Sequence, residues 1–292
     1  MKALLTGLLI SGLMLVNTLV GIVPMMIIAL MRLLVPVQAF QDRCSDAVTW
    51  IAETWAAINK RLFNLFTHTE WDVRGEFTLD RHQSYLLVCN HQSWVDIPAI
   101  IQVFNRKVPF FRFFLKHQLI WVPLLGLAFW ALEFPFMRRY SKEVLARKPH
   151  LRDKDKEATR AACERFRYRP VTMINFPEGT RFTPAKHDRQ QSPYARLLRP
   201  KAGGMAFVLE SMGDQIDHIL DVTVAYPNGT PTFLQLITGQ VSRVVIEVRQ
   251  IPVKPEWKQG NYSDDDAYRQ AFQHWVSTLW EEKDERLRVW QE

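Results

Sequence analysis

A histidine and an aspartate stand five positions apart between an apolar run and a helix-like segment. His91 and Asp96 lie in NHQSWVD, after YLLVC and before IPAII. On one regular helix, where each residue turns by about 100°, this spacing would separate the two side chains, so they need a turn to meet. The apolar run predicts a buried strand and Asp-Ile-Pro predicts a helix start, which places a turn between them. Asp96 could then accept the Nδ1 proton of His91 and leave Nε2 free as a general base.

The same two residues allow a plainer interpretation. Asp96 could be the N-cap of a helix, and His91 a polar residue at a strand end. The chemical interpretation needs no serine or cysteine nucleophile in the protein. A hydroxyl group on a bound substrate would give its proton to His91 and attack a carbonyl group directly.

NFPEGTR, residues 175–181, is a second segment whose residue types could do chemistry. It follows the apolar run VTMI, and its proline and glycine predict a turn that places Glu178 and Arg181 at a strand exit. A surface turn with an ion pair is one interpretation. The other is an anion site, in which Gly179 lets backbone donors approach a phosphate and Arg181 offers a fork of hydrogen bonds. Arg139, in FPFMRRYS, is a candidate second arginine.

The composition favours a folded protein at a membrane surface. The 292 residues are 48% hydrophobic, which argues against disorder. A net charge of +7 is compatible with nucleic acid, anionic lipid or phosphorylated substrates. No RNA-binding or helix-turn-helix signature is present, and the basic residues adjoin aromatic and apolar runs, so we expect a phospholipid membrane and no nucleic acid as partner. Cys44, Cys89 and Cys163 lack metal-ligand or disulfide spacing, which predicts reduced thiols and a cytoplasmic catalytic part.

The N-terminus predicts membrane embedding. Ala3 to Met31 carries no charge over 29 residues. A helix of that length reaches about 43 Å, which exceeds the roughly 30 Å of a hydrocarbon core. Gly21 and Pro24 interrupt the run, so either one kinked helix or two shorter helices are expected. Residues 1–40 are therefore predicted to be a membrane anchor and residues 41–292 the catalytic domain.

The remaining pattern predicts an α/β fold. Strands are expected near residues 71–77, 84–89, 170–176, 218–226 and 243–253, and helices near 44–67, 97–104, 155–166, 203–212 and 264–288. Strands that alternate with helices indicate a mixed sheet covered by helices on both faces, with functional loops at the strand ends. A shorter uncharged run, Gln118 to Leu132, predicts an interfacial or buried segment. The last helix is expected to start at Ser263 with a packing stripe of aromatic residues.

NHQSWVD and FPEGTR, with an arginine-bearing segment between them, resemble the motif set of the glycerolipid acyltransferases of the lysophosphatidic acid (1-acylglycerol-3-phosphate) type. KHQLIWVPLLG, residues 116–126, matches the Lys, Leu, Pro, Gly spacing that precedes the second motif of this family. The resemblance covers roughly residues 70–255. Longer stretches, among them DVTVAYP, resemble a bacterial inner-membrane member and the eukaryotic lysocardiolipin and lysophosphatidylinositol remodelling branch.

The resemblance implies roles for particular residues. His91 is the general base and Asp96 its orienting partner. The acceptor-phosphate site is implied to contain Arg139, Glu178, Gly179, Thr180 and Arg181, with Lys116 and Lys201 as further substrate-binding candidates. Two departures leave the identity of the acceptor open: Glu133 stands where the second motif usually has glycine, and VTVAYP lacks the usual Val-Pro of the fourth motif.

These residues predict O-acylation of a lysophospholipid at its sn-2 hydroxyl, with lysophosphatidic acid or a remodelling substrate such as lysophosphatidylglycerol as acceptor. The donor would be acyl-CoA or acyl carrier protein, whose thioester is already activated, so no further cofactor and no metal is required. RKVPFFRFFLK, residues 106–116, mixes four cations with four phenylalanines, which favours either contact with lipid head groups or an amphipathic core helix. The implied location is the bacterial inner membrane, with the catalytic domain facing the cytoplasm.

Two other function classes remain open on the sequence. A membrane-associated lipid-binding scaffold would bind lysolipid without releasing CoA. An amine N-acyltransferase, whose acceptor needs no phosphate, would keep full activity when Arg181 is replaced by alanine.

Overall fold

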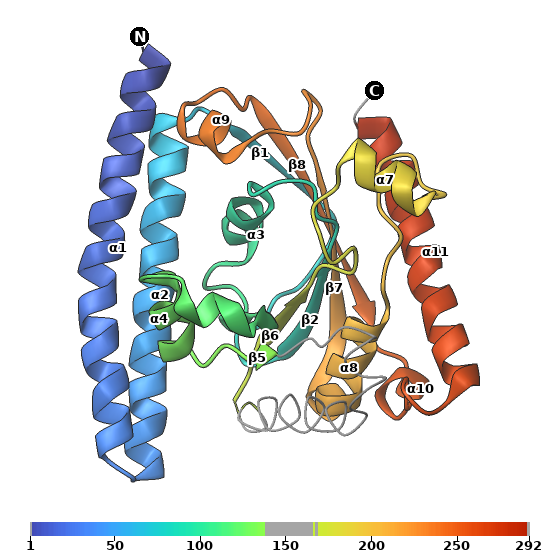
Figure 1. The fold of residues 1–292 in the computed structure, drawn as a ribbon, viewed down its shortest axis with the longest axis horizontal. Coiled ribbons are helices and arrows are strands. Elements are labelled where there is room, and N and C mark those ends of the chain that lie inside the picture. The colour runs from blue at the N-terminus through green and yellow to red at the C-terminus, as the bar shows by residue number, and fades with distance from the viewer. Residues whose placement is uncertain (1, 138–165, 167–168, 291–292) are drawn as a thin grey trace.

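Two long N-terminal helices lie side by side along one edge of the molecule (Figure 1). The computed structural model describes residues 2–137, 166 and 169–290. Helix α1 (Lys2–Leu34) is continuous and contains Pro24, so the alternative of two shorter helices is wrong. Helix α2 (Gln38–Phe66) begins before the predicted amphipathic segment.

By length and composition α1 could cross a membrane. Only 17% of its most apolar 18-residue window is buried inside the protein, whereas the core helix of a soluble protein is mostly buried. Polar groups join α1 to α2: Asn17 donates to Asn59 Oδ1 at 3.0 Å, and Trp55 Nε1 donates to Thr18 Oγ1 at 3.0 Å. The exposed apolar surface of α1 indicates a membrane location.

A six-stranded mixed sheet forms the centre of the domain. Its strands, in spatial order, are β1 (Glu70–Arg74), β8 (Arg243–Pro252), β7 (Ile216–Ala225), β2 (Ser84–Cys89), β6 (Thr172–Asn175) and β3 (Phe111–Arg112). Only β7 and β8 run antiparallel; the other neighbours are parallel. The predicted mixed α/β sheet is confirmed, and the added edge strand β3 is only two residues long.

Strand β2 explains why helices cover both faces of the sheet. All six of its residues are buried. Successive side chains of a strand point to opposite faces, and accordingly Leu87 and Cys89 join one core cluster, whereas Leu86 and Val88 join another. Helix α3 (Asp96–Phe104) contributes to the first core, and α8 (Gly203–Met212) with α11 (Asp266–Trp290) contributes to the second.

An ion pair sealed in the second core joins the last helix to the sheet. Lys283 on α11 and Asp221 on β7 are both fully buried, with 2.8 Å between Nζ and Oδ1. Helix α11 begins at Asp266, three residues after the predicted start, and Asp265 Oδ1 accepts the backbone N–H of Tyr268 at 3.0 Å. The predicted aromatic stripe does pack into the core.

A small substructure follows α3. It contains β3, β4 (Leu115–Lys116), a 3-10 helix (His117–Trp121), α4 (Leu125–Ala131) and β5 (Phe136–Met137), and β4 pairs with β5 in a separate two-stranded sheet. The uncharged run from Gln118 to Leu132, predicted to be interfacial or buried, is exposed in one part and buried in another. Trp121 is 80% exposed, whereas Leu132 is buried. Residues 106–116 contain the short strands β3 and β4 and no helix, so the alternative of an amphipathic core helix is wrong. Arg112 is buried, and contact of this segment with lipid head groups stays a prediction.

Four short elements that were not predicted complete the described chain: α7 (Pro184–Gln190), a 3-10 turn (Gly213–Gln215), α9 (Phe233–Ile237) and α10 (Pro255–Lys258). Arg139, Cys163 and all of the predicted helix at 155–166 except Phe166 lie outside the described residues.

Candidate active site

The turn between β2 and α3 brings His91 and Asp96 into contact. His91 Nδ1 lies 2.8 Å from Asp96 Oδ2, as the sequence predicted. Helix α3 begins at Asp96 itself, and its N-cap position is Val95, which makes no side-chain capping bond. The carboxylate instead turns back to accept the backbone N–H groups of Gln92 and Ser93 at 2.8 and 3.0 Å. The interpretation of Asp96 as a helix N-cap is therefore wrong.

Tyr226 completes the surroundings of Asp96. The Asp96 side chain is fully buried, and its Oδ1 accepts the Tyr226 hydroxyl at 2.5 Å. Burial, together with the adjacent Asp96 carboxylate, raises the pKa of Tyr226 well above its usual value, so its hydroxyl remains a donor at neutral pH. With its two backbone donors and His91, Asp96 receives four groups that fix its orientation, and the carboxylate in turn fixes the imidazole.

The reactive side of the imidazole stays open. The His91 ring stacks on Phe176, with 4.3 Å between ring centroids and 28° between planes. Its side chain is 19% exposed. Within the part of the chain that the structure describes, Nε2 has no hydrogen-bond partner. A general base requires this arrangement, in which one nitrogen is oriented by the protein and the other faces the substrate.

Side chains on both sides of His91 hold the loop against β7 and its following segment. The Asn90 amide donates to Val224 O at 2.9 Å and accepts from Val224 N at 2.8 Å. Ser93 Oγ donates to Pro231 O at 2.5 Å. Sequence reasoning missed Asn90, Ser93 and Tyr226 as contributors to this site. The signal for Tyr226 was its place in VTVAYP, which was interpreted only as a departure from a motif.

Glu178 ties the catalytic loop to a second loop. Its side chain is fully buried, Oε1 accepts the backbone N–H of His91 at 2.8 Å, and Oε2 accepts that of Leu198 at 2.9 Å. Burial raises the pKa of Glu178 to about 8, although these two donors act in the opposite direction. The carboxylate is thus neither part of a surface ion pair nor open to a substrate. The place in an acceptor-phosphate site that the resemblance implies for Glu178 stays a prediction; in the described structure both oxygens accept from backbone N–H groups.

The second loop is itself held by the last helix. Asp284 on α11 accepts the backbone N–H groups of Ala195 and Arg196 at 2.8 and 2.7 Å. Leu198, three residues after Ala195, is the donor to Glu178. Three segments that are distant in sequence therefore support the backbone of His91.

The rest of FPEGTR runs along the edge of the site. Gly179 has a φ of +68°, a conformation that residues with a Cβ rarely adopt. A Cβ at this position would lie 3.8 Å from Lys201 Nζ, so the ammonium group is close to the glycine backbone. Thr180 Oγ1 accepts from Lys186 Nζ at 2.7 Å. The backbone N–H of Phe182 donates to His91 O at 2.7 Å, which joins this loop directly to the catalytic turn.

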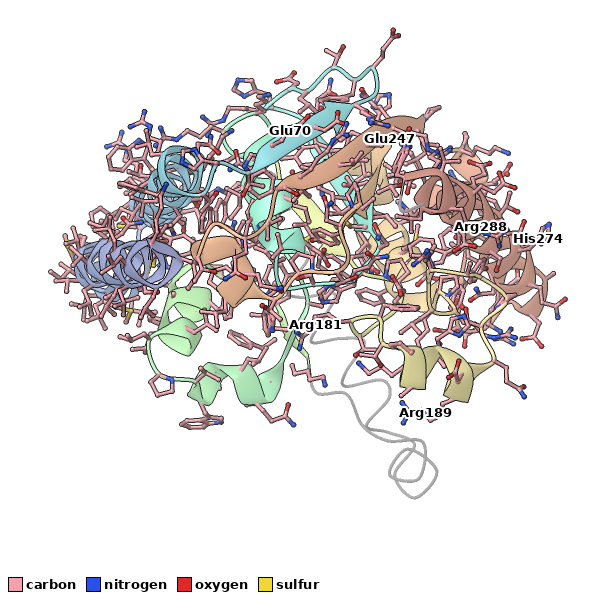
Figure 2. All side chains as sticks on the ribbon, turned by 90° about the horizontal axis from the view of Figure 1, so that it is seen from above. Glu70, Arg181, Arg189, Glu247, His274 and Arg288 are labelled. Carbon is pink, nitrogen blue, oxygen red and sulfur yellow. The ribbon has the colours of Figure 1, made fainter. Side chains whose placement is uncertain are left out.

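Arg181 is exposed beside the catalytic turn. Its guanidinium lies 4.6 Å from the ring centroid of Trp94, which is 60% exposed and belongs to NHQSWVD. Figure 2 shows Arg181 at the edge of the molecule, between α4 and the side that carries Arg189. The stacking contact orients the guanidinium without using its N–H donors, which stay available to an anion.

The structure gathers most, but not all, of the predicted site residues. The two catalytic candidates and the loop that carries Gly179, Thr180 and Arg181 are joined by backbone hydrogen bonds, and Lys201 adjoins that loop. Lys116 lies on β4 in the separate two-stranded sheet, and it makes no hydrogen bond or ion pair with any described residue. Its role remains a prediction, as does that of Arg139.

Comparison with known proteins decides the family. The model of the family described as Acyltransferase matches residues 70–227, more than half of the chain and all of the site described above except Pro231 and the support from α11. The chain belongs to the acyltransferase family. This confirms the resemblance seen in its motifs.

Relatives of this acyltransferase differ in the acceptor that they are named for. The present chain is 27% identical over 218 residues to a probable 1-acyl-sn-glycerol-3-phosphate acyltransferase 5 of Arabidopsis thaliana. The match covers 70% of this chain and 55% of that protein. The present chain is 25% identical over 252 residues to lysocardiolipin acyltransferase 1 of Gallus gallus, covering 82% of this chain and 62% of that protein. The chain therefore spans less than two thirds of the length of these curated relatives.

A solved structure shares the fold. The 1-acyl-sn-glycerophosphate acyltransferase PlsC of Thermotoga maritima matches with a TM-score of 0.53 and 20% identity, over 96% of this chain and 98% of that one. The match includes the N-terminal helices, because almost the whole chain is covered.

The structure accounts for one departure from the family pattern. Glu133, where glycine was expected, has a φ of +59°, in the left-handed region that glycine adopts most easily. Its carboxylate lies 3.2 Å from Arg32 Nη1, near the end of α1. The ion pair joins the end of α1 to the turn that follows α4.

Proposed function

We propose that this acyltransferase moves a fatty acyl chain from acyl-CoA or acyl carrier protein to the sn-2 hydroxyl group of a lysophospholipid. The observation that carries the proposal is the 2.8 Å contact between His91 Nδ1 and buried Asp96, with Nε2 left open. A hydroxyl group is too weak an acid to ionise beforehand. A positioned base that removes its proton as the new bond forms supplies about 10²–10⁴ in rate.

The reaction proceeds by direct attack. The acceptor hydroxyl gives its proton to His91 Nε2 while its oxygen bonds to the thioester carbonyl carbon. The carbon–sulfur bond then breaks, and the protonated imidazole returns the proton to the leaving thiolate. Asp96 stabilises the transient positive charge on the ring, as a buried carboxylate does in other His–Asp pairs.

The acceptor is positioned through its phosphate. Arg181, held by Trp94, and Lys201, close to the Gly179 backbone, supply positive charge on one side of the catalytic turn. An arginine fork matches the geometry of a phosphate group, and each charged hydrogen bond contributes on the order of 1.5–3 kcal/mol. Lysophosphatidic acid and a remodelling substrate such as lysophosphatidylglycerol both satisfy this requirement.

The membrane supplies the acceptor. The apolar surface of α1 supports embedding in the bacterial inner membrane. The free, buried thiols of Cys44 and Cys89 are consistent with a catalytic domain that faces the cytoplasm, where thiols stay reduced and thioester donors are found.

An acyl-transfer assay with the full chain in detergent tests the proposal. Acyl-CoA and acyl carrier protein with labelled chains are offered separately, each with lysophosphatidic acid, lysophosphatidylglycerol or a long-chain amine. We expect an ester product, release of free thiol, and loss of both in His91→Ala. Lysolipid binding with no thiol release from either donor would support a scaffold, and an amide product made equally well by Arg181→Ala would support an N-acyltransferase.

A further inference from the structure

Arg112 is a buried cation whose hydrogen-bonding capacity is not met by the described protein. It lies on β3, is 6% exposed, and its Nε has no hydrogen-bond partner. Its other nitrogens come no closer than 3.4 Å to Thr49 Oγ1 and to the carbonyl oxygens of Phe110 and Phe111. Typical N–H···O distances are about 2.7–3.2 Å, so these contacts are long.

Aromatic rings enclose the Arg112 guanidinium. Its central carbon lies 4.9, 5.4 and 5.8 Å from the ring centroids of Phe110, Phe134 and Phe166. The rings attract the cation but also exclude water, and a buried charge without a counter-charge is costly. Burial lowers the pKa of Arg112 to about 10, which still leaves it protonated at neutral pH.

The guanidinium lines a cavity of about 220 Å³ between α2, β3 and the turn that contains Glu133. The carboxylates in the lining are already engaged by other arginines: Glu53 by Arg81 at 2.8 Å, Glu133 by Arg32 at 3.2 Å, and Asp46 by Arg169. Among the described lining arginines, Arg112 alone has no carboxylate within ion-pair distance. Glu133 and Glu53 attract Arg112 from a greater distance, but neither accepts a hydrogen bond from it, so the cavity contains a guanidinium whose N–H donors are largely unused.

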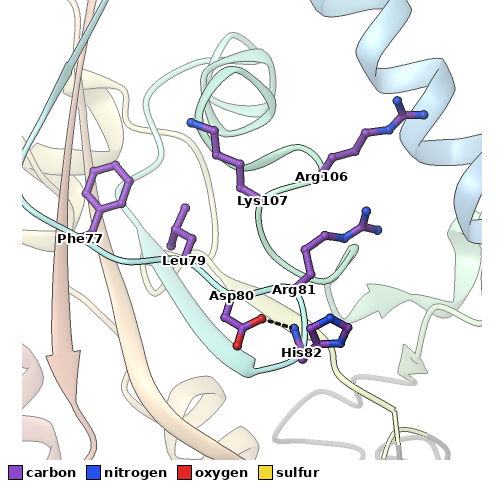
Figure 3. Close-up of a pocket in the computed structure, with 7 residues that line it drawn as sticks. All are labelled: Phe77, Leu79, Asp80, Arg81, His82, Arg106 and Lys107. Carbon is purple, nitrogen blue, oxygen red and sulfur yellow. Dashed lines mark hydrogen bonds between the residues drawn. The ribbon is translucent and has the colours of Figure 1, made fainter.

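A neighbouring hollow of about 500 Å³ contains no buried arginine among its described lining residues. It shares Arg81 and His82 with the smaller cavity. Figure 3 shows Phe77 and Leu79 on one side of it and Arg106 on the other. Its arginines are exposed and pair with Glu53, so water and protein already satisfy them.

We propose that the smaller cavity binds a phosphate group, with the Arg112 guanidinium as its main donor. A buried polar group without a partner commonly marks an ion or ligand, and the arginine fork fits phosphate oxygens. The phosphate belongs either to the head group of an anionic phospholipid or to a free phosphate ion. Arg32, near the end of the apolar helix α1, pairs with a residue of the lining, which puts the cavity close to where lipid head groups would lie. None of the lining residues belongs to NHQSWVD or FPEGTR, so this site is separate from the proposed acyl transfer.

Thermal unfolding of the full chain in neutral detergent tests the proposal without any acyl donor. One arm adds sodium phosphate at constant ionic strength. The other adds short-chain phosphatidylglycerol, with diacylglycerol of the same chain length as its phosphate-free control. Arg112→Met removes the charge but can still fill the space between the rings. Arg74→Met is the matched control, because Arg74 also lies over a ring, that of Trp290, but has Asp72 as its ion-pair partner.

We expect Tm of the wild-type protein to rise by about 5 °C at a ligand concentration of about one hundred times Kd. Arg112→Met loses this rise and Arg74→Met keeps it. A rise with sodium phosphate identifies a free ion as sufficient, and a rise with phosphatidylglycerol alone identifies a lipid head group. No rise with either ligand, or an equal rise in Arg112→Met, overturns the proposal. If Arg112→Met does not fold, Arg112→Lys keeps the charge without the fork and should weaken Kd by about tenfold.

Discussion

Two fully buried aspartates have different partners in this acyltransferase, and the difference separates the proposed catalytic pair from a structural one. Asp96 is surrounded by two backbone N–H groups, the Tyr226 hydroxyl and the His91 imidazole. Asp221 is held by two permanent cations, with Lys283 Nζ at 2.8 Å and Arg249 Nη2 at 2.6 Å. Burial raises the pKa of Asp221, but these cations outweigh it and bring the pKa below its usual value.

The partner decides what remains available for chemistry. Lys283 is completely enclosed, and its ammonium group also donates to Val222 O and Thr223 Oγ1 at 2.6 and 3.0 Å, so it cannot reach a substrate. His91 uses Nδ1 on Asp96 and leaves Nε2 without a partner among the described residues, so this nitrogen stays available to a substrate. A carboxylate can thus either seal a core or prepare a base.

The largest expected effect is on the reactive pair. Asp96→Asn should lower kcat/KM by about 10³–10⁴, because the neutral amide no longer stabilises the positive charge that the His91 ring gains when it takes the substrate proton. Steady-state kinetics with the acceptor that the acyl-transfer assay selects measures the effect, and circular dichroism verifies that the variant is folded. Activity within tenfold of the wild type would show that Asp96 does not orient the base.

Breaking the structural pair should change stability and leave chemistry intact. Lys283→Met leaves Asp221 buried with only Arg249, which should lower the free energy of unfolding by about 3–5 kcal/mol, as measured by denaturant titration. Lys258→Met is the matched control, since Lys258 also pairs with an aspartate at 2.8 Å, but Asp217 is 69% exposed, and the expected loss is about 0–1 kcal/mol. Equal losses in the two variants would contradict the contrast between sealed and exposed pairs.

Glu178, a third buried carboxylate, has no ion-pair partner among the described residues, and its two oxygens accept from backbone N–H groups. Its pKa is raised to about 8 in the folded protein against an ordinary value of 4.5. The folded state therefore retains a proton that the unfolded state releases earlier, so the free energy of unfolding should fall as pH rises from about 4.5 to about 8, by at most about 1.4 kcal/mol per pH unit. Glu178→Gln should flatten this dependence in denaturant titrations across that range. An unchanged slope would assign the dependence to other groups.

The smallest expected effect concerns Tyr226. Tyr226→Phe removes one of four donors to Asp96 and should lower kcat/KM about fivefold, equivalent to roughly 1 kcal/mol. Steady-state kinetics measures this loss. Tyr85→Phe is the control: this tyrosine is also fully buried, but its hydroxyl accepts from Asp80 N at 3.0 Å, and kcat/KM should not change. An equal loss in both variants would indicate a general packing effect.

The sequence was sufficient for features that depend on local pattern. Strand β2 and helix α8 have the predicted bounds, because continuous apolar runs and helical periodicity define them without help from distant residues. The contact between His91 and Asp96 followed from a turn between two recognisable elements. Strands β3, β4 and β5 have two residues each, which is too short for any periodicity to show.

What the sequence could not predict depends on contacts between distant segments. Tyr226 reaches Asp96 across 130 positions, and Glu178 becomes buried only because the backbone of Leu198 folds over it. The burial of Arg112 was not predicted either, because the phenylalanines beside it are equally compatible with contact to lipid head groups. Such outcomes require the tertiary arrangement, because residue type and spacing alone do not indicate which face of a turn is covered.

The hydrogen bonds from the backbone of residues 195 and 196 to Asp284 connect helix α11 to the proposed catalytic site. The backbone of His91 is thus held by a series of hydrogen bonds that ends on α11, about one hundred and ninety positions further along the sequence. A change that displaces α11 is therefore expected to loosen the turn between β2 and α3, even when α1 and the sheet are undisturbed.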